Sequence, residues 1–100
     1  MNKLMLMLAL FFLAFPALAQ LNEQQLKEHE ARLAANPNDQ EALLKLGIHY
    51  HNRGGEGDEK AVEKAVDFLD RLLQLNNRNT LAMAFYGSAV TMPDFPLKFY

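Results

Sequence analysis

The chain contains no cysteine and no tryptophan, and its charge is nearly balanced. Without cysteine it forms no disulfide, and we expect no lipid anchor, because there is no cysteine to acylate. Ten basic and twelve acidic residues give a formal net charge of −2, and they are spread along the chain. No basic stripe can therefore neutralise a row of phosphates, which argues against nucleic acid as a partner.

Motifs for catalysis, metal binding and phosphate binding are also missing. The only serine, Ser88, falls inside a predicted helix and not at the strand-to-helix turn of a nucleophile elbow. His49 and His51 are two residues apart, so on a helix they point in nearly opposite directions and cannot share one ion. The glycines of residues 54–57 lack the lysine of a phosphate loop. We therefore expect no enzyme, no cofactor and no metal site.

The first nineteen residues are typical of a cleavable export signal. A lysine precedes an unbroken apolar run over residues 4–15, which is shorter than the roughly 20 residues of a membrane-spanning helix. A proline ends this run, and Ala17 and Ala19 provide the small side chains that signal peptidase requires. We predict cleavage between Ala19 and Gln20, membrane contact only during export, and a periplasmic or, alternatively, secreted mature protein.

After the signal peptide, apolar residues recur with the period of amphipathic helices, and no alternating strand pattern is present. The second helix is expected to begin at Asn38 as its N-cap, and a glycine-rich break at residues 54–57 to follow it. The expected fold is all-α, an antiparallel stack of helix pairs. The predicted helices cover residues 22–35, 39–52, 59–75 and 80–91.

The chain also resembles itself when it is shifted by forty residues. Self-similarity of this length indicates a solenoid, in which each helix pair buries its apolar face against the next. Glycine recurs at one helix position, where we expect neighbouring helices to cross closely. The matched pairs are Leu33 with Leu73, Asn36 with Asn76, Ala42 with Ala82, Leu43 with Met83, and Gly47 with Gly87.

The second and third predicted helices resemble a tetratricopeptide repeat. In that family the first helix carries a large apolar residue, a Leu-Gly pair and an aromatic residue, and the second helix carries an alanine, large apolar residues and a closing turn. The period here is longer than the usual 34 residues, leucine stands at one position that usually holds alanine, and asparagine replaces the closing proline. The matching residues are Leu43, Leu46, Gly47, Tyr50, Ala65, Leu69, Leu72 and Asn77.

The resemblance implies a right-handed helix stack over residues 20–92 that binds protein, as an adaptor in the bacterial cell envelope. In the family, a concave groove lined by the first helix of each pair holds the partner. Apolar residues in this groove suit an apolar peptide or a neighbouring subunit, although Leu44 and Ile48 could instead pack beneath the first helix or the tail. The expected groove residues are Leu44, Ile48, His51, Asn52, Leu81, Ala84 and Ser88.

A second hypothesis is self-association through the last helix and the aromatic tail at residues 93–100. The tail follows a proline break, and it could fold back, dock on another chain or lead into further sequence. A homodimer would cover an apolar surface that rarely stays bare on a monomer. The residues expected at this edge are Tyr86, Val90, Phe95, Phe99 and Tyr100.

Overall fold

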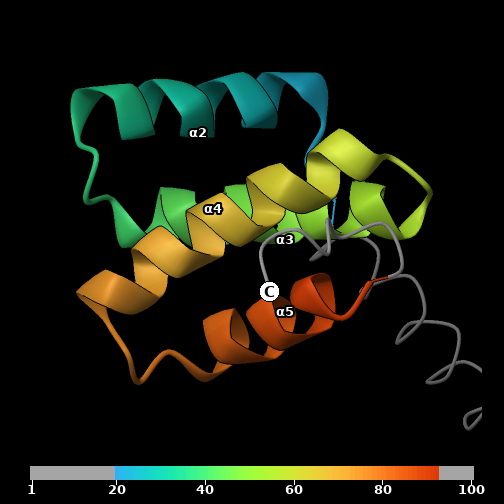
Figure 1. Ribbon diagram of the computed structural model, residues 1–100. Helices are drawn as coiled ribbons and strands as arrows, with labels where there is room; N and C mark the ends of the chain where they lie inside the picture. Colours follow the sequence, from blue (N-terminus) through green and yellow to red (C-terminus); the bar gives the residue numbers. More distant parts are fainter. Residues whose placement is uncertain (1–19, 93–100) are drawn as a thin grey trace, which may run out of the picture.

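The computed structural model describes residues 20–92, which form four helices joined by short turns (Figure 1). Within this range there is no strand, so the all-α prediction is confirmed. None of these helices is both long and apolar enough to span a bilayer. The helices are α2 (Glu23–Ala35), α3 (Gln40–Gly55), α4 (Glu59–Leu75) and α5 (Thr80–Val90).

Several predicted features lie outside the described residues. They are the signal peptide at residues 1–19, with Ala17 and Ala19 of the predicted cleavage site, and the tail residues Phe95, Phe99 and Tyr100. Gln20, on the other side of the predicted cut, is the first residue described.

α3 is the central helix and packs against each of the other three. α4 runs along α3, while α2 and α5 lie on opposite sides of this pair (Figure 1). The core consists of fully buried side chains from α3, α4 and α5, whereas α2 buries none of its residues completely. Helix α2 therefore covers the core edge with half-buried residues only. One cluster of this core consists of Leu43, Leu69, Leu72 and Ala82, with Leu33, Leu44, Phe68, Leu73, Phe85 and Tyr86 packed around them.

The turn between α2 and α3 has the same hydrogen bonds as the turn between α4 and α5. Asn36 and Asn76 each end a helix in extended backbone, and each side-chain oxygen accepts the N–H two residues later at 3.1 Å. Asp39 and Asn79 then cap the following helix, accepting the N–H three residues later at 3.0 Å. The forty-residue self-similarity thus extends to backbone geometry.

The predicted N-cap of α3 was wrong by one residue. The N–H of Asn38 bonds to Asn36 Oδ1, which holds Asn38 in the turn. Asp39 is the N-cap, because its Oδ1 accepts the Ala42 N–H. A carboxylate at this position is also stabilised by the positive end of the helix dipole.

The predicted end of this helix was also wrong. α3 continues beyond Asn52 to Gly55, and Gly54 is buried against α4. A Cβ on Gly54 would lie 2.5 Å from Val62 Cγ2, so only glycine permits this close approach. The chain then reverses at Gly57, whose φ of 106° favours glycine, and Asp58 caps α4, which begins at Glu59 as predicted.

The two repeated glycines differ in their surroundings. A Cβ on Gly47 would lie 2.6 Å from Leu69 Cδ2, which confirms that α3 and α4 cross closely there. No described residue lies within 4 Å of the corresponding position on Gly87. The expected close crossing is therefore found at Gly47 and has no counterpart at Gly87 among residues 20–92.

Candidate functional site

Hydrogen bonds between the side chains of Asn52, His51 and Ser88 connect α3 to α5 on the side predicted to form the groove. His51 Nε2 lies 2.8 Å from Ser88 Oγ, and His51 Nδ1 lies 2.9 Å from Asn52 Oδ1. Because Asn52 Oδ1 can only accept, Nδ1 carries the proton and Nε2 accepts from the Ser88 hydroxyl. The edge of the His51 ring also meets Phe85 at 4.8 Å between centroids. These contacts hold two helices at a fixed spacing.

The predicted groove residues from α5 share one exposed face. Leu81, Ala84 and Ser88 follow i, i+3, i+7 spacing, and Leu81 is 54% exposed. Those from α3 are less accessible. Ile48 is only 9% exposed, and Leu44 packs partly against the core. The accessible apolar surface of the groove is consequently concentrated on α5.

His51 and Asn52 are half-buried on α3, beside this α5 face. They provide polar atoms at its border. Between α3 and α5 the structure brings His51 into contact with Ser88, while Ile48 is withdrawn from the surface.

Sequence reasoning missed the pairing of His51 with Ser88, because 37 residues separate them and no motif links them. Hydrolases with a catalytic triad use a nucleophile, a base and a third residue that orients the base, and serine, histidine and asparagine can take these three roles. Acyl transfer also needs free N–H donors for an oxyanion, and Ser88 lies inside α5, where backbone N–H groups bond along the helix. The absence of enzyme activity stays a prediction.

A different face of α5 forms what we call the α5 edge, made of Met83, Tyr86 and Gly87. Met83 is 45% exposed and Tyr86 is half-buried. Met83 and Gly87 are four residues apart and so lie on one side of the helix, away from Leu81 and Ser88. Val90, predicted at the same edge, is half-buried.

A cleft between α2 and α4 is a feature that the sequence did not indicate. Its floor is Tyr50 of α3 stacked on Phe68 of α4, with ring centroids 5.8 Å apart. Lys64 Nζ lies 5.0 Å from the Tyr50 centroid, and Arg71 lies over Phe68. Burial, followed by the nearby Glu30 carboxylate, raises the pKa of Tyr50. The stacked rings and the two cation–π contacts stabilise the packing of α4 on α3.

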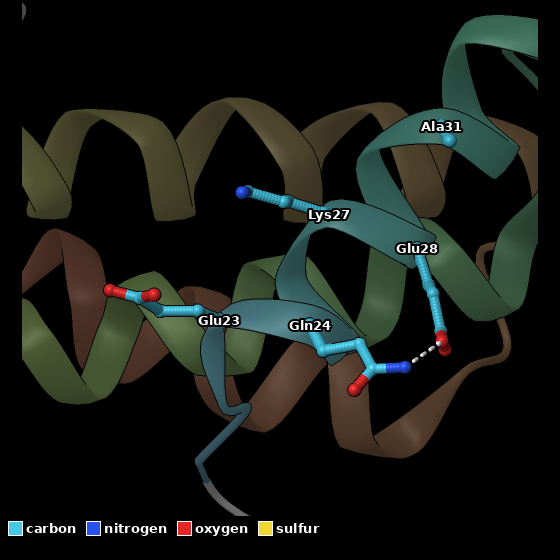
Figure 2. Close-up of a pocket in the computed structure, with 5 residues that line it drawn as sticks. All are labelled: Glu23, Gln24, Lys27, Glu28 and Ala31. Carbon is cyan, nitrogen blue, oxygen red and sulfur yellow. Dashed lines mark hydrogen bonds between the residues drawn. The ribbon is translucent and has the colours of Figure 1, made fainter.

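The outer face of α2 forms a shallow hollow (Figure 2). All of its lining residues come from this one helix, and a Gln24–Glu28 hydrogen bond of 3.4 Å is the only interaction drawn among them. Figure 2 shows side chains that diverge instead of converging on a centre. This surface is a solvated helix face. The lining residues are Glu23, Gln24, Lys27, Glu28 and Ala31.

His49 is the one buried ionisable side chain of α3. Its Nδ1 accepts the Leu21 N–H at 3.4 Å, and its Nε2 has no hydrogen-bond partner among the described residues. Burial lowers the pKa of His49, and the positive charge of Arg53 lowers it further. No group of three potential metal ligands occurs in residues 20–92. His49 therefore acts as a neutral core residue at neutral pH.

Comparison with protein-family models, curated proteins and solved structures found no match to this chain. The tetratricopeptide resemblance accordingly stays a prediction based on the residues named above.

Proposed function

We propose that this chain is an exported adaptor of the bacterial cell envelope that binds another protein, in the manner of a tetratricopeptide domain. The binding surface is the face shared by α3 and α5. The main support is the exposure of Leu81 on a helix that His51 and Ser88 hold at a fixed position beside α3. The apolar amino-terminal segment at residues 1–19 supports export.

The chemistry of this face favours a peptide with apolar side chains and some backbone hydrogen-bonding capacity. Leu81 and Ala84 provide apolar surface, while Ser88, His51 and Asn52 provide polar atoms at its border. Since the two helices are already fixed, a partner would not have to order them, which lowers the entropic cost of binding.

A photo-cross-linking amino acid placed at Ala84 tests this proposal in the organism that makes the protein. We expect a discrete adduct with another protein, and none when the same amino acid replaces Ala31 on the outer face of α2. Leu81→Glu should remove the Ala84 adduct, while Met83→Glu on the α5 edge should not. An Ala84 adduct that persists in the Leu81→Glu variant would contradict the groove assignment.

The alternative function, self-association, uses the α5 edge and is favoured by the exposure of Met83. It predicts dimers that dissociate on dilution and are weakened by Tyr86→Glu and by Phe99→Asp. Sedimentation velocity over a range of concentrations measures this directly.

A further inference from the structure

We propose that the α5 edge is a docking site for an amphipathic helix of another protein, and that this helix carries the same apolar pattern as α4. The site lies on a different side of α5 from the groove, so it is a second binding surface. The inference goes beyond the adaptor function proposed above and does not require the groove to be occupied.

The first step is how α3 holds α4. Leu43 and Leu46 of α3 are fully buried, and Gly47 allows Leu69 of α4 to approach within a distance that no side chain would permit. The receiving face of α3 thus consists of two large apolar residues around a glycine. The inserted residue is a leucine.

The second step is that α5 carries the same face. Met83, Tyr86 and Gly87 occupy the positions of Leu43, Leu46 and Gly47 in the forty-residue repeat. The turn before α5 has the same hydrogen bonds as the turn before α3. The forty-residue offset therefore relates the two helices in the structure as well as in the sequence.

The third step is that Met83 and Gly87 of this face stay exposed within residues 20–92, while Tyr86 packs partly against the core. Leu43 is fully buried, whereas Met83 is 45% exposed, and the space above Gly87 is open to at least 4 Å within residues 20–92. Glycine is unfavourable inside a helix unless close packing requires it. An exposed methionine beside a glycine is also suited to accommodate a helix, because the thioether side chain adapts its shape.

The identity of the occupant follows from α4. Its inserted face has a small residue, Ala65, followed by Leu69 and Leu72 at i+4 and i+7, all fully buried. A second copy has no such face to offer, since its α4 is already buried in its own core. In α2 the positions forty residues earlier hold Gln25, His29 and Arg32. None of the described helices of a second copy offers a free face of this pattern, so we assign the site to a helix of a different protein with a small residue and two leucines at this spacing.

The test uses protein of residues 20–100, which include the whole described fold, and a labelled peptide of residues 59–75 as the probe. Fluorescence anisotropy should detect binding to the wild-type protein. Gly87→Leu should weaken binding at least tenfold, because the new side chain fills the space for the inserted leucine. Leu81→Glu, on the other face of the same helix, should leave the affinity within twofold. Peptide with Leu69→Asp should not bind.

The fold of the variants is checked separately by circular dichroism and thermal melting. Gly87→Leu should fold, since no described residue is close enough to clash with the added side chain. A loss of binding with an unchanged melting curve therefore reports on docking. Binding through the groove is measured separately by the Ala84 cross-link. Either proposal can therefore be contradicted without affecting the other.

Four outcomes would overturn the proposal. They are no peptide binding to wild type, binding unchanged by Gly87→Leu, a wild-type dimer that Tyr86→Glu dissociates, or binding that appears only after Phe95→Ser and Phe99→Ser. The third result would assign the edge to a second copy of this chain. The fourth would assign it to the chain's own tail.

Discussion

Gly47 and Gly87 occupy the same position in the repeat, and only Gly47 has a close neighbour among the described residues. A side chain at Gly47 would push against Leu69 in the centre of the core. The same side chain at Gly87 would meet no neighbouring helix within 4 Å among residues 20–92. Substitutions at Gly47 and Gly87 therefore distinguish two effects on stability. At Gly47 the new side chain affects packing, whereas at Gly87 it affects mainly the helix-forming tendency.

Gly47→Leu should lower the free energy of unfolding by about 1–3 kcal/mol, the usual cost of overpacking a core. Gly87→Leu should leave it unchanged or raise it by up to about 1 kcal/mol, because leucine forms helix better than glycine. Urea denaturation followed by circular dichroism measures both variants. A Gly47→Leu variant as stable as the wild type would show that α3 and α4 do not meet at this residue.

His49 should make stability depend on pH. Burial lowers the pKa of His49 in the folded state below its ordinary value of 6.5. Below pH 6.5 the unfolded chain takes up a proton that the folded chain does not, so stability falls as the pH decreases. The groups facing this histidine are Arg53 of α3, Glu56 at the C-cap of α3, Glu30 of α2 and the backbone N–H of Leu21.

Urea midpoints at pH 7.5 and 5.5 should thus differ more in wild type than in His49→Leu. His51→Gln is the matched control, since it changes a neighbouring histidine that is only half-buried. An equal pH dependence in wild type and His49→Leu would mean that His49 is not the group responsible.

At the scale of the helices, local capping signals predicted the start of α4 correctly and placed the cap of α3 one residue early, at Asn38 instead of Asp39. Asp58 and Asn76 bracket α4 as expected, and the capping box of Asn22 with Gln25 begins α2. The end of α3 was misjudged because glycine normally breaks helices, whereas Gly54 is retained by its contact with Val62 on another helix. Such a non-local contact leaves no trace in the neighbouring sequence.

Asn79→Ala should remove the N-cap of α5 and cost about 1 kcal/mol, since the Ala82 N–H loses its side-chain acceptor. Asn77→Ala, in the same exposed turn, should change stability much less. Chemical denaturation distinguishes the two. Equal losses in both variants would indicate that the turn as a whole, and not the cap, sets the start of α5.

At the scale of the whole molecule, the helix stack followed from hydrophobic periodicity, while the accessibility of its surfaces did not. The tetratricopeptide resemblance implied that Ile48 and Leu81 share the groove side, but only packing determined that Ile48 is buried and Leu81 exposed. The His51–Ser88 bond joins residues from different repeats and was likewise beyond the sequence pattern. The two faces of α5 became distinct only once its neighbours were placed.

Export predicts a defined amino terminus. Protein recovered from the cell envelope should begin at Gln20, and Ala19→Phe should leave uncut precursor in the membrane, because signal peptidase accepts only small residues there. Mass spectrometry of the intact protein measures the cleavage position. An exported wild-type protein that retains Met1 would contradict the prediction.

Affinity for the partner captured at Ala84 tests the proposed adaptor function most directly. With purified partner in isothermal titration calorimetry, Leu81→Glu should weaken binding at least tenfold, because it places a carboxylate on the most exposed apolar residue of the groove. Met83→Glu, an equally drastic change on the α5 edge, should alter the Kd by less than twofold. Wild-type affinity in Leu81→Glu, or an equal loss in both variants, would contradict binding through the face shared by α3 and α5.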